Sequence, residues 1–227
     1  MDRANMHKEF KLLLDKAGGG GAPSFISEEI DRFLNIAQDK FVSKRAFGNN
    51  VRRTSFEEDQ KRRDDLRTLV RNEVISSTVD SSSNKPNGAF FQLPNHYRHS
   101  INEEALIFTI GDGNSQRRVG VTPITHDRYN KIIDDPFNKP GKDTVYRLDF
   151  GGNSYGSHVE LIVGDGQQVG QYHLRYIVEP PQIKTGTDCV LPDHTHREIV
   201  RMAVVDALET VEQPRYQTSK IELNEIE

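Results

Sequence analysis

The residues best suited to metal binding stand near the carboxyl end of the chain, where a histidine precedes a glutamate by four positions. His194 and Glu198 would lie on one face of a helix, where both could bind a metal ion. His196 would point about 200° away from His194 around the same helix, so it could not join them. The pair alone lacks the third protein ligand that a zinc site needs. We interpret it as part of a solvated helix start, with a metal-assisted hydrolase as the remote alternative.

Cys189 is the only cysteine of the chain, which limits its chemistry. A lone thiol excludes an intrachain disulfide and a structural zinc site built on cysteines, and it fits folding in a reducing cytoplasm. As a nucleophile Cys189 would need an environment that favours the thiolate.

Other short motifs with possible chemistry have simpler interpretations. Two Gly-Asp-Gly pieces, at Asp112 and Asp165, lack the spaced acids and closing glutamate of an EF-hand, so they predict β-hairpins. Four glycines at 18–21 lack the Lys-Ser/Thr of a phosphate loop and predict a hinge. The string GNSYG at 152–156 matches Gly-x-Ser-x-Gly in letters only, because it lies in a turn between two predicted strands and not before a helix. No His-Glu-x-x-His motif occurs. We therefore expect an interaction protein and no enzyme, with no catalytic residue, cofactor or metal.

Length, composition and charge also limit the class of protein. The chain has 227 residues, of which 34% are hydrophobic, and its net charge is −4. This length allows one large or two small domains. The charge excludes a general affinity for nucleic acid, because phosphate binding depends on Lys and Arg. Charges interrupt the start of the chain, and no run approaches the ~20 apolar residues of a membrane span, so we expect no signal peptide and no membrane partner.

Apolar residues at helical spacing predict a helical module made from the two ends of the chain. A helix begins at Ser27, which is a good N-cap with acidic residues after it. A second helix follows the Ser55–Glu58 capping box, and a third begins at Pro192. Since their apolar faces would pack together, we assign residues 27–76 and 191–211 to this module.

The second of these helices would bury one side and expose charges on the other. Its buried side is expected to consist of Leu66, Leu69, Val70 and Val74. A DNA-binding or packaging accessory protein would use its arginines, namely Arg52, Arg53, Arg63 and Arg67. Acidic residues interleave with these arginines at the spacing of stabilising ion pairs, which favours a solvated or subunit-facing surface. DNA binding stays open as the alternative function.

From residue 88 to residue 183 the apolar period changes from helical to two, which predicts β-strands. Leu106, Phe108 and Ile110 show this alternation, and glycine-rich turns separate the runs. Short strands joined by tight turns predict an antiparallel sheet or sandwich. The predicted fold class is therefore α+β, with a β-rich module at 88–183 inserted into the helical module.

Polar or glycine-rich segments lie at both ends of the chain. Residues 1–26 are interpreted as an N-terminal arm that ends in the glycine hinge. Residues 212–227 contain the helix-stopping Pro214 and a polar run with little to pack on in its own copy. We interpret them as a C-terminal arm in which Ile221 and Leu223 contact a neighbouring subunit.

Several pieces of the sequence, taken in order, resemble the virion ring proteins of crAss-like tailed bacteriophages. The pieces are FLNIAQDKFV (33–42), FEEDQKRRDDLRTLV (56–70), FFQLPNHYRHS (90–100), PITHDRYNKIIDDPFNKP (123–140), VYRLDF (145–150), QYHLRYIVEPPQI (171–183) and LPDHTHREIVRMAVVDALE (191–209). The resemblance spans nearly the whole chain except the amino-terminal glycines and the last dozen or so residues.

This resemblance implies a structural subunit of the head-to-tail connector. The subunits would form a homo-oligomeric, dodecameric ring around the DNA exit channel. Their partners would be the portal protein, other ring or tail proteins, and the genomic DNA that passes through the lumen. The protein would be made in the host cytoplasm and reside in the virion. The resemblance supplies no catalytic residue.

The segment 125–140 interrupts the strand pattern with a short helix and an aromatic tip. Pro136 would end the helix, and Phe137 with Pro140 would form a rigid, apolar-tipped loop. We interpret the segment as a subunit contact with Tyr129 and Phe137 as anchors, because aromatic anchors tend to dominate interface energy. In the alternative, both aromatics only cover the edge of their own sheet.

Overall fold

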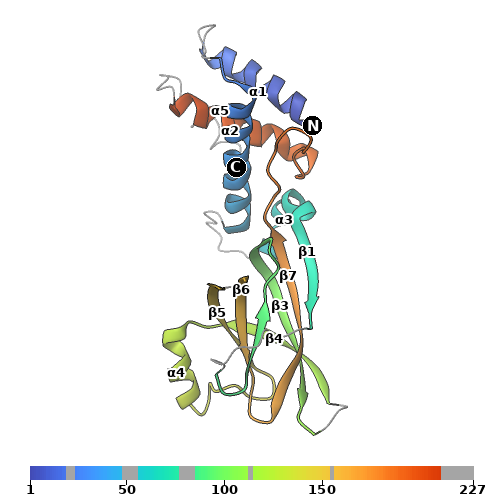
Figure 1. Cartoon of the computed structure of the whole chain (residues 1–227), viewed down its shortest axis with the longest axis vertical. Helices are drawn as coiled ribbons and strands as arrows, with labels where there is room; N and C mark the ends of the chain where they lie inside the picture. Colours follow the sequence, from blue (N-terminus) through green and yellow to red (C-terminus); the bar gives the residue numbers. More distant parts are fainter. Residues whose placement is uncertain (19–23, 48–55, 77–84, 112–114, 154–155, 211–227) are drawn as a thin grey trace. The chain divides into compact units, whose positions relative to one another are not determined.

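The structure is a computed structural model, and it describes residues 1–18, 24–47, 56–76, 85–111, 115–153 and 156–210. The chain divides into two compact units (Figure 1). We call Met1–Leu69 with Glu179–Glu227 the helical unit, and Val70–Val178 the sheet unit. The predicted α+β class, with a sheet inserted between two helical segments, is confirmed. Among the described helices, none combines the length and the apolar character needed to cross a bilayer.

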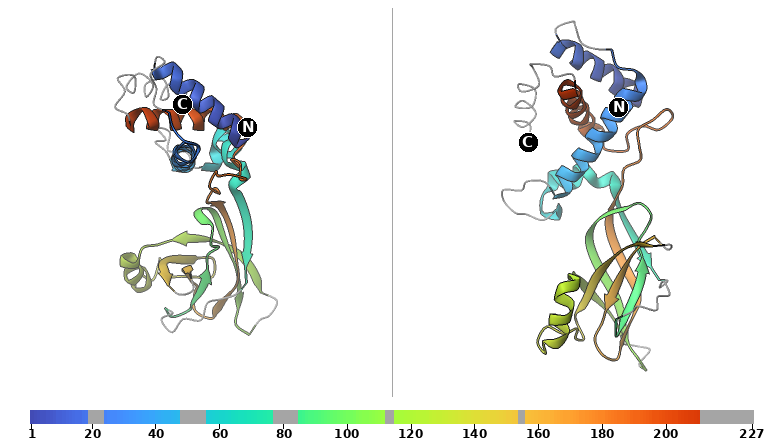
Figure 2. Two further views of the ribbon diagram at one scale, coloured as in Figure 1. Left: turned by 45° about the horizontal axis from the view of Figure 1, so that its top comes forward. Right: turned by 60° about the vertical axis from the view of Figure 1, so that its left-hand side comes forward.

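Amphipathic helices build the helical unit. Its described α-helices are α1 (Arg3–Gly18), α2 (Ser27–Phe47), α3 (Gln60–Leu66) and α5 (Asp193–Thr210), and the 3-10 turns η1 (Phe56–Glu58) and η2 (Arg67–Leu69) flank α3. Helix α5 packs against both α1 and α2 (Figures 1 and 2). The buried apolar side chains of these three helices recur every three or four residues. They include Met6, Phe10, Leu14, Ile30, Leu34, Ala37, Phe41, Ile199, Val200, Ala203 and Ala207.

A curled seven-stranded sheet forms most of the sheet unit. Its strands are β1 (Val70–Ile75), β2 (Gly88–Gln92), β3 (Tyr97–Thr109), β4 (Gln116–Pro123), β5 (Val145–Asn153), β6 (Gly156–Ile162) and β7 (Gln167–Val178). They lie in the order β1-β7-β3-β4-β5-β6-β2. Every neighbouring pair is antiparallel except β4 and β5, which run parallel.

The parallel pair explains the helical insertion. Antiparallel neighbours can be joined by a tight turn, whereas parallel neighbours need a crossover connection. The chain between Pro123 and Val145 supplies this crossover and contains α4 (His126–Asp134), which lies beside the sheet (Figure 2). Because successive residues of a strand point to opposite faces, Leu148 and Ile162 face α4 while the neighbouring Leu161 joins the main core.

Residues 3–18, expected as part of an N-terminal arm, form α1 instead. Met6 and Phe10 are 0% exposed and Leu14 is 3% exposed. These side chains lie one turn apart on one face, and burying them is worth about 1.5–3 kcal/mol each relative to leaving them exposed. The arm interpretation is therefore corrected for these residues, which belong to the helical unit.

The predicted second helix is shorter than expected, because its second half is a strand. Helix α3 ends at Leu66, and Val70–Ile75 form β1, which pairs antiparallel with β7. β-Branched residues favour a strand when a partner is present, and here tertiary pairing overrides the helical spacing. Val74 is 51% exposed, so its assignment to a buried helix face is wrong. Asp59 caps α3, since its carboxylate accepts a hydrogen bond from the Lys61 N–H at 3.0 Å.

Candidate assembly site

Helix α4 is fastened to its own sheet by Tyr129. This side chain is 6% exposed and packs on Leu148 and Ile162. Burial, reinforced by the nearby Glu160 carboxylate, raises the pKa of the Tyr129 hydroxyl. The Lys85 ammonium lies 5.1 Å from the centre of the ring. Tyr129 therefore covers its own sheet, as in the alternative interpretation, and its role as a subunit contact stays a prediction.

The loop that follows α4 holds Phe137 outward on a fixed backbone. Phe137 is 95% exposed. The Asp135 carboxylate accepts hydrogen bonds from the Phe137 N–H at 3.0 Å and from the Asn138 amide at 2.6 Å, and these bonds lower the pKa of Asp135. The Tyr146 hydroxyl donates to the Asn138 carbonyl at 2.7 Å. An exposed aromatic on a backbone held in this way is preorganised to bind, because little entropy remains to be lost.

Pro136 and Pro140 flank the exposed ring on this loop, as the sequence predicts. Both are candidate subunit-contact residues, and Pro136 is exposed whereas Pro140 is half-buried. Gly164 lies under the end of the loop. A Cβ atom at Gly164 would be 2.9 Å from the Pro140 carbonyl oxygen and 3.0 Å from that of Gly141. The loop therefore needs glycine at position 164 to lie where it does.

Gly164→Ala is expected to displace the loop and to destabilise the sheet unit by about 1–2 kcal/mol, because a backbone carbonyl cannot yield as a side chain can. Ring assembly should weaken with it, although Phe137 itself is unchanged. Urea unfolding and electron microscopy of the purified variant measure the two effects. Gly120→Ala is the matched control, since a Cβ there meets nothing within 4 Å. Equal behaviour of the two variants would contradict the positioning role of Gly164.

A groove lies beside α4 on the same side of the unit. It has a volume of about 400 Å³. Its lining residues come from β4, the connection between β4 and α4, α4, the exposed loop and β5. They are Thr122, Pro123, Ile124, Arg128, Lys131, Ile132, Asp135, Asn138 and Tyr146. This groove was not predicted from the sequence. Arg128 and Lys131 stand three apart on α4, away from the Tyr129 face, and that spacing was the available signal.

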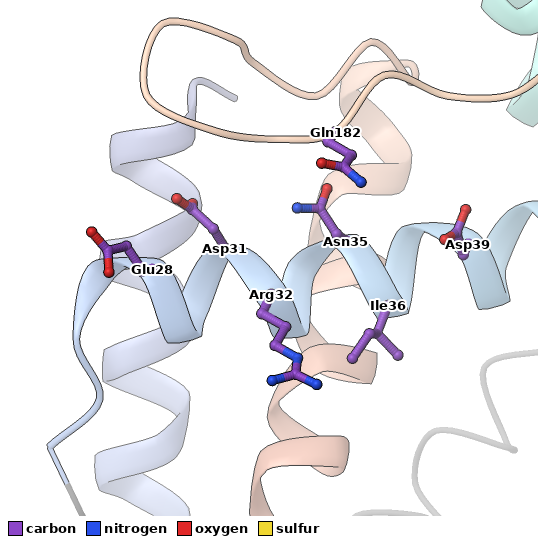
Figure 3. A pocket seen from close by; sticks show the side chains of 7 residues that line it. All are labelled: Glu28, Asp31, Arg32, Asn35, Ile36, Asp39 and Gln182. Carbon is purple, nitrogen blue, oxygen red and sulfur yellow. The ribbon is translucent and has the colours of Figure 1, made fainter.

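A second, polar groove runs along α2 in the helical unit, with a volume of about 450 Å³ (Figure 3). Its lining residues are Glu28, Asp31, Arg32, Asn35, Ile36, Asp39 and Gln182. The Asp31 carboxylate binds Arg3 and His7 of α1 at 2.7–2.8 Å. Burial opposes the charge of Asp31, but these two partners outweigh it and lower its pKa. Asn35 exchanges hydrogen bonds of 2.7 and 3.0 Å with the Ile183 backbone. These two polar groups therefore hold the unit together.

The two residues considered as metal ligands, His194 and Glu198, each have another partner. The Arg45 guanidinium lies 2.8 Å from an Asp65 oxygen and 2.9 Å from a Glu198 oxygen. His194 Nε2 lies 2.9 Å from the other Asp65 oxygen. A buried cation already neutralises the carboxylates that a metal ion would need. The described residues hold no group of three or more His, Cys, Asp or Glu suited to a metal ion.

Cys189 is not placed for nucleophilic chemistry. Its side chain is buried, and its Sγ donates a hydrogen bond to the Gln38 side chain at 3.2 Å. Burial raises the pKa of the thiol to about 11. The thiolate, which is the reactive form, is therefore scarce at neutral pH.

His196 is a structural histidine at the start of α5. It is 2% exposed, its Nε2–H donates to the Leu191 carbonyl at 2.7 Å, and its Nδ1 lies 2.9 Å from the Met1 amino group. Burial lowers the pKa of His196, while the bond to Leu191 acts in the opposite direction. The folded protein therefore holds this imidazole neutral at a pH where the unfolded chain already binds a proton.

The helical unit is expected to lose stability as the pH falls from 7 to 5. Neutral His196 contributes fully to the free energy of unfolding above the pKa of about 6.5 that it has in the unfolded chain. This contribution declines as the pH falls towards the lower pKa of the folded protein, by at most about 1.4 kcal/mol per pH unit. His196→Gln should remove this part of the slope in urea unfolding at the two pH values. The exposed His96, replaced in the same way, should leave the slope intact. If the free energy of unfolding of His196→Gln depends on pH as strongly as that of the wild type, His196 is not the source of the pH dependence.

The remaining predicted residues are only partly described. Arg63 and Arg67 are exposed on α3 and η2. Arg52, Arg53, Asp112, Ile221 and Leu223 lie outside the described residues. Asp165 belongs to the turn between β6 and β7, where its carboxylate accepts a hydrogen bond from the Asn87 amide at 2.7 Å.

Known proteins that are similar to this chain are phage ring proteins. Residues 1–219 match the family described as "Phage tail ring protein 3/4". The chain is 27% identical over 221 residues to "Ring protein 3" of Bacteroides phage crAss001, covering 86% of this chain and 90% of that protein. It is 23% identical over 217 residues to "Ring protein 4/5" of the same phage, covering 86% and 87%. The predicted resemblance is confirmed, and the chain belongs to the phage tail ring protein 3/4 family.

Proposed function

We propose that this chain is a structural subunit of the phage head-to-tail connector. Copies of it form a dodecameric ring around the DNA exit channel, in contact with the portal protein and with other ring or tail proteins. The protein is made in the host cytoplasm and becomes part of the virion. It performs no catalysis.

The observation that carries this proposal is the match of residues 1–219 to the phage tail ring protein 3/4 family. The match spans both units, so neither is left over for a separate activity. The chemistry of the described candidate centres points the same way, because Arg45 neutralises Asp65 and Glu198, and burial keeps the Cys189 thiol protonated.

Phe137 supplies a specific contact for ring closure. A ring needs a heterologous interface, in which one surface of a copy meets a different surface of the next. A single exposed aromatic on a fixed loop suits such an interface, because it can fill a pocket that lies elsewhere on the neighbour. The net charge of −4 suits a lumen through which DNA slides, since a basic channel would hold the phosphates.

Electron microscopy and native mass spectrometry of the purified full chain test the proposal, with and without the portal protein. Closed rings of uniform subunit number, together with the protein's presence in mass spectra of purified virions, are the expected result. Absence from virions would overturn the proposal. Salt-dependent binding of the lone chain to duplex DNA would favour the accessory role of Arg52, Arg53, Arg63 and Arg67 instead.

A further inference from the structure

The groove beside α4 combines an apolar floor with a basic rim. Ile124, Ile132 and Tyr146 contribute the apolar surface, and Arg128 and Lys131 contribute the charge. Both basic side chains are exposed, and neither has an ion-pair partner among the described residues. A site of this kind favours an occupant that carries apolar and acidic side chains close together.

The acid that lines the groove, Asp135, offsets only part of this charge, so the two basic side chains remain in excess. Asp135 directs its two carboxylate oxygens to the Phe137 N–H and the Asn138 amide. Its carboxylate is therefore engaged in shaping the exposed loop. The groove remains a basic, partly apolar site on a chain whose net charge is −4.

The chain itself contains a segment of matching composition. The run KIELNEIE at 220–227 interleaves three aliphatic residues with three glutamates, namely Ile221, Leu223, Ile226, Glu222, Glu225 and Glu227. In an extended conformation Ile221 and Leu223 would point to the same side, about 7 Å apart, and Glu222 to the other. Apolar side chains could then meet the floor while glutamates reach Arg128 and Lys131.

A connecting stretch separates this run from α5. Helix α5 ends at Thr210, and residues 211–219 follow before the run begins. Nine residues span up to about 30 Å when extended, which exceeds the width of a helix and approaches the diameter of a small domain.

We propose that residues 220–227 of one subunit bind in the α4 groove of the next subunit in the ring. The inference rests on the proposed ring function and names a contact that closes it. A nucleic acid phosphate would also meet the two basic side chains, but it would leave Ile124, Ile132 and Tyr146 unmatched. The apolar floor therefore favours the protein segment.

Charge exchange between the two surfaces tests the proposal in the full chain. One variant carries Arg128→Glu and Lys131→Glu, and the other carries Glu222→Lys and Glu225→Lys. Each alone should raise the concentration needed for ring assembly at least about ten-fold, because like charges then face each other. A mixture of the two variants should assemble as the wild type does. In an alternating ring every reversed groove meets a reversed tail, and every unchanged groove meets an unchanged tail.

The matched control reverses two exposed lysines of α1 at the same spacing. Lys8→Glu with Lys11→Glu changes the charge by the same amount outside the sheet unit and should leave assembly unchanged. If the mixture fails but a chain carrying all four exchanges assembles, the tail binds its own copy and the proposal is overturned. Wild-type assembly by both single-surface variants overturns it as well.

A labelled peptide of residues 214–227 separates this inference from the proposed function. It should bind the full chain and lose at least about ten-fold in affinity against Arg128→Glu with Lys131→Glu, whether or not rings form. Peptide binding without rings would contradict the ring function alone. Rings without groove-dependent peptide binding would contradict the docking of the tail. Groove-dependent binding of duplex DNA in place of the peptide would assign the groove to nucleic acid and overturn the proposal.

Discussion

Replacement of Arg147 by methionine is expected to lower the free energy of unfolding of the sheet unit by about 3–5 kcal/mol, the usual effect of breaking a buried ion pair. Arg147 on β5 and Glu103 on β3 are each 8% exposed, and the guanidinium donates a hydrogen bond to the Glu103 carboxylate. The Tyr172 hydroxyl, on β7, donates to the other Glu103 oxygen at 2.9 Å. Methionine would fill the space of the arginine but leave Glu103 without its counter-charge.

The pKa values in this cluster show why the arginine matters. Burial alone would lower the pKa of Arg147, but Glu103 and then Asp149 outweigh it and raise that pKa. Burial raises the pKa of the Tyr172 hydroxyl, and the Glu103 charge raises it further. The tyrosine therefore stays protonated as a neutral donor, and Arg147 supplies the positive charge that Glu103 needs.

Urea unfolding of the full chain, with hydrogen exchange of the β3, β5 and β7 amides to identify the sheet transition, measures this loss. Arg118→Met is the matched control, because Arg118 is 60% exposed and lies 3.6 Å from the adjacent Glu104. An exposed pair of this kind contributes about 0–1 kcal/mol. Adding Glu103→Leu to Arg147→Met should recover part of the loss. Equal effects of Arg147→Met and Arg118→Met would contradict a special role for the buried pair.

The sequence predicted the elements whose pattern is local. Helices α2 and α5 follow from apolar residues at helical spacing, and strands such as β3 and β7 follow from alternation. Strand β1 was missed because Val70 and Val74 fit both a helical spacing and a strand, and only pairing with β7 decides between them. The parallel β4–β5 pair was also missed, since strand order is a non-local property that no short pattern encodes.

The candidate assembly site was predicted only in part, for the same reason. Phe137 between two prolines indicated a rigid, exposed tip, and the structure places that ring 95% exposed. Tyr129 has the same residue class, but its exposure depends on which face of α4 meets the sheet. The groove could not be predicted without the strand order. Its floor combines Ile124 and Tyr146, which come together only when β5 pairs with β4.

Phe137→Ala is expected to abolish ring assembly at concentrations where the wild type assembles, while the folded subunit keeps its stability. A buried aromatic anchor at an interface contributes about 2–4 kcal/mol, and this contact would be repeated at every junction of the ring. The side chain is 95% exposed in the single chain, so its removal should change the free energy of unfolding by less than about 0.5 kcal/mol. Native mass spectrometry gives the ring yield, and urea unfolding gives the stability.

Ile110→Ala is the matched control for this prediction. Ile110 is another large, exposed apolar residue of the sheet unit, at 65%, but it follows β3 and lies outside the α4 insertion. Its loss should leave both ring yield and stability unchanged. If Phe137→Ala still forms intact subunit rings, the loop is not part of the interface. If the variant loses stability while the yield of subunit rings is unchanged, the Phe137 side chain packs on its own subunit. Gly164→Ala moves the same loop but keeps the Phe137 side chain. It should therefore weaken assembly by less than Phe137→Ala does.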